Sequence, residues 1–147
     1  MSSEEFYAHF SDRADGGLLV SHGPKSGQIS LKAMPDRLFV LVEGEPDGKV
    51  LTDCFREALA SDRFNIDVPS VVDLTRYHGQ VDWAALRAIR DMAPWKPHMT
   101  AIVVRPHTMF DLIIKIVGTI FVNAQLRIFN SHDEAVSWLD SAPPTHH

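Results

Sequence analysis

Ser70-Val71-Val72-Asp73-Leu74-Thr75 is the stretch from which the rest of this sequence is best understood. It is short, apolar and β-branched, and it follows Pro69, which is typical of a buried central strand. The polar segment 76–81 then predicts a loop, and Asp82 has the residue type of an N-cap. Open α/β sheets usually place their binding surface where such a strand ends and the next helix begins. The candidate residues of this region are Asp73, Thr75, Tyr77, His78, Asp82 and Trp83.

Outward from this stretch, strand and helix patterns alternate along the chain. Residues 28–34 alternate in polarity, 38–42 and 99–104 are continuously apolar, and 125–129 alternate again, so all four predict strands. Helical patterns follow at 50–59, from 83, at 108–122 and from 131. Thr108 is a candidate cap for the third of these helices, and Ser131 and Glu134 have capping-box spacing at the start of the fourth. Alternation of this kind predicts an α/β domain with a mostly parallel five-stranded sheet, about four helices and an antiparallel first strand at one edge. The predicted organisation is an N-terminal arm at 1–27, the domain at 28–140 and a flexible tail at 141–147.

The amino-acid composition of the chain limits the kinds of function that it can have. The chain has 147 residues, a net charge of −5, 45% hydrophobic residues and a single cysteine, Cys54. These values predict one globular domain without an intrachain disulfide, and they argue against nucleic acid as the main partner. No signal-peptide pattern opens the chain and no apolar run is long enough to span a bilayer, so we expect a cytoplasmic protein without a transmembrane segment.

Motifs that would specify an enzyme or a cofactor site are missing from the sequence. The eight histidines show no zinc-ligand spacing, and neither a phosphate-binding glycine loop nor a Gly-x-Ser-x-Gly elbow occurs. We therefore predict no catalytic residues, no metal and no cofactor. One enzymatic alternative stays open, in which Asp73 and His78 converge with Arg105 or His107 in a single pocket. Otherwise Asp73 is expected to bond nearby loop amides, and His78 to be a solvated loop histidine.

The segment 108–122 is the most informative for function. Its polar residues Asp111, Lys115 and Thr119 are four apart and form one narrow stripe, so most of the helix surface is apolar. One side must pack on the sheet, and a second apolar side needs a cover. Three covers are open: the N-terminal arm, a second protein surface, or an apolar ligand or membrane surface. The predicted partner-binding residues are Met109, Phe110, Ile113, Ile116, Val117 and Ile120, and Gly118 suggests close approach of another element.

From about residue 29 to residue 139, the pattern resembles the SpoIIAA-like (STAS/Sec14-like) family. The resemblance is carried by Val-Val-Asp-Leu at 71–74, the helix entry at 79–86, Ala-Ile-Val-Val at 101–104, and the closing segments 127–129 and 134–139. It implies a bacterial, non-catalytic domain that binds proteins, nucleotides or lipids. In the anti-sigma-factor antagonists of this group a serine at the start of the helix after the central strand is phosphorylated. Here 82–86 reads Asp-Trp-Ala-Ala-Leu, so that switch is not expected.

Together these features predict a non-catalytic, regulatory protein-interaction module that self-associates through the helix 108–122. The alternative is a carrier or sensor of a lipid or another apolar small ligand.

Overall fold

A computed structural model describes residues 1–11, 16–95 and 99–141. Within them, six strands form one sheet whose spatial order follows the chain. Antiparallel pairs join the first three strands, and parallel pairs join the third to the sixth. The strands are β1 (Leu18–His22), β2 (Gly27–Ala33), β3 (Leu38–Gly44), β4 (Ser70–Tyr77), β5 (Met99–Val103) and β6 (Gln125–Phe129).

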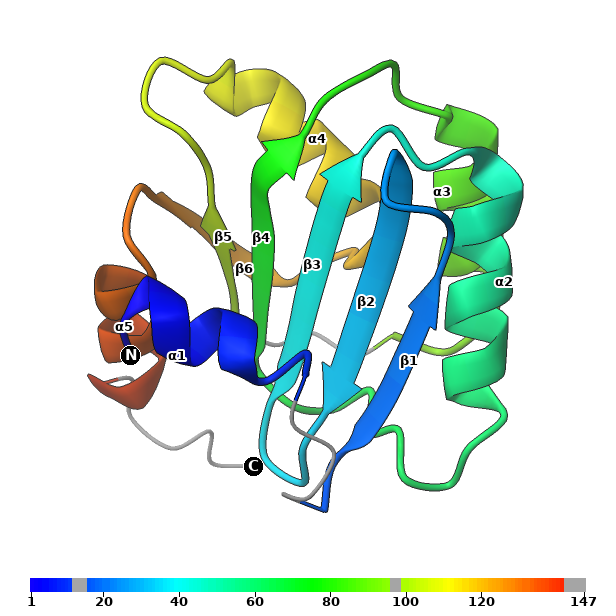
Figure 1. Ribbon diagram of the computed structural model, residues 1–147, viewed down its shortest axis with the longest axis horizontal. Helices are drawn as coiled ribbons and strands as arrows, with labels where there is room; N and C mark the ends of the chain where they lie inside the picture. The colour runs from blue at the N-terminus through cyan, green and yellow to red at the C-terminus, as the bar shows by residue number, and fades with distance from the viewer. Residues whose placement is uncertain (12–15, 96–98, 142–147) are drawn as a thin grey trace.

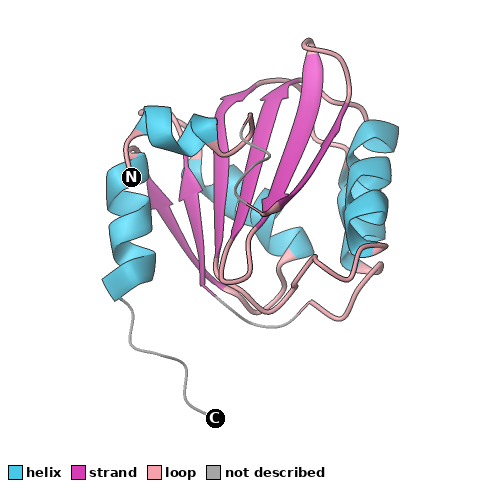
Figure 2. Ribbon diagram, turned by 60° about the horizontal axis from the view of Figure 1, so that its bottom comes forward, coloured by secondary structure: helices cyan, strands magenta, loops and turns pink. Residues whose placement is uncertain are grey.

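The helices of the described chain cover the two faces of the sheet unequally (Figure 1). On one face lie α2 (Gly48–Leu59), α3 (Trp83–Arg90) and α4 (Phe110–Ile120). On the other lie α1 (Ser3–Ala8) and α5 (His132–Ser141), side by side near the strands β3 to β6 (Figure 2). Because successive side chains of a strand point to opposite faces of the sheet, each strand contributes side chains to two separate cores.

Strand β4 shows this division most clearly. Val72 and Leu74 belong to the larger core under α2, α3 and α4. Val71 belongs to the smaller core under α1 and α5, which is centred on Phe6 and Phe39. Asp73 has the same parity as Val71, so its carboxyl points toward α1 and α5 and away from the larger core.

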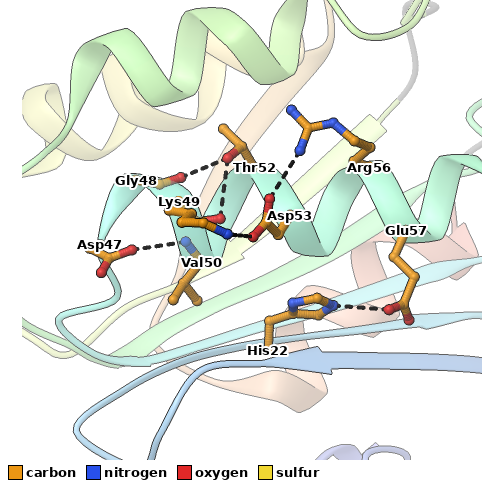
Figure 3. Close-up of polar contacts among 9 residues, drawn as sticks. All are labelled: His22, Asp47, Gly48, Lys49, Val50, Thr52, Asp53, Arg56 and Glu57. Atoms are coloured by element: carbon orange, nitrogen blue, oxygen red, sulfur yellow. Dashed lines mark hydrogen bonds and ion pairs between the residues drawn. The ribbon is translucent and has the colours of Figure 1, made fainter.

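Local signals in the sequence account for helix α2 (Figure 3). The Asp47 carboxylate accepts a 2.9 Å hydrogen bond from the Val50 amide, as an N-cap does. On the outer face Asp53 pairs with Lys49 and Arg56, and these exposed pairs add little stability. On the inner face Cys54 is fully buried, and burial raises the pKa of its thiol to about 12. The thiol is therefore a packed apolar group, as the helical pattern predicts.

The predicted α/β class is confirmed, and several details of it are corrected. The described chain has six strands and five helices, where the sequence predicted five and about four. The added elements, α1 and β1, both come from 1–27, and they pack on the sheet or within it, so the described parts of this segment do not form a separate arm. Strand β1 also displaces the predicted first strand from the edge. The predicted tail begins one residue early because Ser141 ends α5, and 142–147 lie outside the described residues.

Two predicted helix caps are confirmed and one is wrong. Asp82 Oδ1 accepts from the Ala85 amide at 3.0 Å, and Ser131 Oγ accepts from the Glu134 amide at 3.4 Å. Thr108, the candidate cap for the third predicted helix, instead donates to the Arg105 carbonyl at 2.6 Å. Helix α4 begins two residues later than predicted, after Met109, which provides no side-chain cap bond.

Candidate functional sites

A hydrogen-bond network converges on Asp73, which is 0% exposed. Its Oδ2 atom lies 2.6 Å from His132 Nε2 and accepts a 2.9 Å bond from the Tyr7 hydroxyl. Its Oδ1 atom accepts 2.7 Å bonds from both the amide and the hydroxyl of Thr75. The network extends outward, because Ser3 Oγ lies 2.9 Å from Nδ1 of His132. Strand β4 thus joins α1 and α5 through a single buried carboxylate.

The environment of Asp73 keeps this carboxyl ionised. Burial alone would raise its pKa, but the hydrogen bonds from His132, Thr75 and Tyr7 outweigh burial and hold the pKa below its ordinary value. Four donors satisfy the four acceptor sites of the carboxylate.

Sequence reasoning identified Asp73 and Thr75 but missed their partners. The strand register could have pointed to His132. Asp73 lies opposite Val103, and Val103 lies opposite Phe129, which is three residues before His132. No comparable signal exists for Ser3 or Tyr7, because α1 pairs with no strand and its position depends on packing. The predicted bonding of Asp73 to loop amides is wrong: the amide that it accepts from, that of Thr75, lies within strand β4, and its other described partners are side chains.

The remaining predicted residues of this region lie elsewhere. Strand β4 runs to Tyr77, two residues beyond the predicted end, so Tyr77 belongs to the strand. Asp82 is the cap described above, and half-buried Trp83 begins α3. His78 is exposed, and its backbone amide donates to the Gly44 carbonyl. Of the six predicted residues, only Asp73 and Thr75 therefore belong to the buried network.

The enzymatic alternative built on Asp73 and His78 finds no support in the described contacts. Asp73 directs its carboxylate to α1 and α5, and none of its hydrogen bonds reaches His78, Arg105 or His107. Those three residues are exposed. The convergence that this reaction centre requires is absent from the described residues.

Helix α4 corrects most of the predicted partner-binding face. Ile113, Ile116, Val117 and Ile120 are buried in the larger core and are unavailable to a partner. Met109 and Phe110 are 72% and 49% exposed. Two further exposed apolar residues were not in the predicted set, Ile114 at 36% and Val122 at 42%. We call Met109, Phe110, Ile114 and Val122 the α4 patch.

Of the covers considered for α4, the N-terminal arm is excluded. Its side chains Phe6, Tyr7 and Phe10 pack in the smaller core, on the opposite face of the sheet. Val20 of β1 joins the larger core beside α2. The α4 patch is therefore uncovered within the described chain.

Gly118 has room for a side chain. A Cβ built there would meet only Leu126 Cδ1, at an ordinary contact distance of 3.5 Å, so no close approach within the described chain requires glycine.

We predict that Gly118→Ala raises the free energy of unfolding by up to about 1 kcal/mol, because alanine restricts the unfolded chain and favours helix. Urea titration measures the change, and Ala88→Gly on the exposed side of α3 should give a change of opposite sign. A destabilised Gly118→Ala monomer would contradict the prediction.

An apolar cavity of about 70 Å³ lies in the larger core, between the sheet and α2, α3 and α4. Its lining includes the apolar residues Phe55, Val72, Ile89 and Ile116, and also Tyr77, Gln80 and Asp82. An apolar cavity of about 150 Å³ is known to hold benzene. The present space is about half as large, so it fits a small apolar guest and is too small for a lipid.

Other site classes find no support in the described residues. No group of three or more His, Cys, Asp or Glu residues there could hold a metal ion. Likewise, none of the described helices combines the length and apolarity needed to cross a membrane.

Comparisons of the chain with protein-family models, with curated proteins and with solved structures found no match. The resemblance to the SpoIIAA-like family accordingly stays a prediction.

Proposed function

We propose that this chain is a protein-interaction module that self-associates through α4, a role that needs no catalytic group. The observation that carries the proposal is the α4 patch, in which four large apolar side chains on α4 and its two flanks are between 36% and 72% exposed. Exposed apolar surface marks interaction sites where such side chains gather.

The charges beside the patch favour a second copy as the partner. Asp111 and Lys115 are exposed, one turn apart, and no ion pair joins them in the described structure. In an antiparallel helix pair related by a two-fold axis near residue 113, Asp111 of one copy faces Lys115 of the other. Both pairs form at once, so the surface is complementary to itself. Ile114 and Phe110 lie next to these charges and supply the apolar contact.

The proposal predicts a concentration-dependent dimer that α4 variants dissociate. Light scattering at micromolar concentrations should give a mass approaching two chains for the wild type and one chain for Ile114→Asp, because a carboxylate replaces a central apolar contact. Lys115→Asp should weaken the dimer through like-charge repulsion. The double variant Asp111→Lys, Lys115→Asp should restore it, since the two-fold pairing is then complementary again. A wild-type mass of one chain throughout the range would overturn the proposal.

The cavity favours a second candidate function, the binding of a small apolar ligand. Its lining is mainly apolar and includes a few residues with polar groups, Tyr77, Gln80 and Asp82, as is typical of small-molecule sites. A lipid carrier would require α4 to move away from the sheet. Native mass spectrometry of the purified chain tests this role directly. Absence of a co-purifying ligand, together with no change in melting temperature under xenon pressure, would count against it.

A further inference from the structure

Ser3, His132 and Asp73 form a continuous hydroxyl–imidazole–carboxylate series. Ser3 Oγ lies 2.9 Å from Nδ1 of His132, and His132 Nε2 lies 2.6 Å from Asp73 Oδ2. A hydroxyl in contact with a base that a third group orients is the arrangement that activates serine nucleophiles. The residues come from α1, α5 and β4, so only the folded chain assembles the series.

Because Asp73 is ionised, it determines which atom donates in each hydrogen bond of the series. The ionised carboxylate can only accept, so His132 presents a protonated Nε2 to it. In the tautomer that carries its one proton there, Nδ1 is unprotonated and accepts the hydrogen bond of the Ser3 hydroxyl. In this tautomer the basic nitrogen is the one that faces serine.

Burial differs along the series in a way that suits a reaction at Ser3. His132 is 4% exposed and stacks on Phe6, with ring centroids 4.4 Å apart, so the orientation of its ring is fixed. Ser3, in contrast, is exposed in the first turn of α1. A small molecule can therefore reach the hydroxyl, while the base and the carboxylate behind it stay shielded from water.

We infer that Ser3 is an activated nucleophile that accepts the acyl group of small activated esters, with His132 as its general base and Asp73 as a positioning residue. Ser3 Oγ bonds to the ester carbonyl carbon as its proton passes to His132 Nδ1. The bond from that carbon to the alcohol oxygen then breaks, and the proton leaves with the alcohol. Water releases the acid and regenerates Ser3 by the same proton path. This inference is independent of the proposed self-association, because the series lies on the opposite face of the sheet from α4.

A fluorophosphonate probe tests the inference, because it bonds covalently to activated serines. The full chain is incubated with the probe, and peptide mass spectrometry locates and times the modification. We expect modification at Ser3 in clear excess over the adjacent Ser2, whose hydroxyl caps α1 by accepting from the Glu5 amide. General-base assistance contributes roughly 10²- to 10⁴-fold. The modification rate should therefore fall at least about 100-fold in His132→Gln, a change that can keep a donor near Asp73.

Two further variants separate reactivity from folding. Asp73→Asn keeps the shape of the side chain but favours the opposite His132 tautomer, so Ser3 modification should also slow, by about 100-fold or more. Ser137→Ala removes an exposed hydroxyl on α5 and should leave the rate unchanged. Circular dichroism confirms folding of each variant. If both His132→Gln and Asp73→Asn unfold, the ratio of Ser3 to Ser2 modification in the wild type decides. Equal modification of Ser2 and Ser3, no modification, or an undiminished rate in folded His132→Gln would overturn the inference.

Discussion

Replacement of Asp73 by alanine is expected to lower the free energy of unfolding by about 3 kcal/mol at neutral pH. The change removes a buried acceptor from four hydrogen bonds and leaves the Nε2–H group of His132 buried without it. Bonds to a charged group contribute about 1.5–3 kcal/mol each, and donors that regain water recover part of the loss. Urea titration followed by circular dichroism measures the effect. Asp53→Ala is the matched control, because that partly exposed surface carboxylate also has a lowered pKa, from its bond to Lys49, and its loss should matter little.

The contribution of Asp73 should depend on pH with a defined sign. The pKa of Asp73 is lower in the folded chain than in the unfolded chain. Between these two pKa values the unfolded chain binds more protons, so stability rises with pH. The contribution is fully present above the ordinary aspartate pKa of about 3.9. It is lost as pH falls through the lowered folded value. The stability difference between the wild type and Asp73→Asn should therefore shrink under acidic conditions. A difference that stays constant down to strongly acidic pH would contradict the ionised state of Asp73.

Ile113→Asp is expected to destabilise the monomer by more than about 4 kcal/mol, enough to abolish cooperative unfolding in a marginally stable domain. Ile113 is 5% exposed in the larger core, and burial of a carboxylate among its apolar side chains carries a large desolvation cost. Its neighbour Ile114 is 36% exposed, so Ile114→Asp should change monomer stability by less than about 1 kcal/mol while affecting self-association. Thermal unfolding at low protein concentration compares the two.

Ile113→Val is the conservative member of this series. It removes one methylene group from the core and should cost about 0.5–1.5 kcal/mol without loss of cooperativity. Equal effects of Ile113→Asp and Ile114→Asp on the monomer would contradict the orientation of α4. The same contrast matters for any association experiment, because only the Ile114 change tests the surface without unfolding the chain.

The sequence alone determined the elements whose signals are local. The β-branched run at 70–75 specified a buried strand, the Asp82 cap specified the start of α3, and alternating patterns specified an α/β sheet. Signals of this kind act within a few residues and do not depend on what packs above them. Strand β1 was harder to predict from the sequence. Its residues, Leu18–His22, form a strand because they pair with β2, and a segment this short carries little local signal of its own.

Only the tertiary structure decided which groups meet and which side of α4 is exposed. The helix is apolar almost all round, so its sequence could not distinguish buried Ile113 from exposed Ile114, and the position of the sheet made that choice. Likewise, Ser3, Tyr7, Asp73 and His132 are up to 129 residues apart along the chain, and no local pattern connects them. Contacts across such separations depend on strand register and on the burial of Phe6, which are properties of the whole fold.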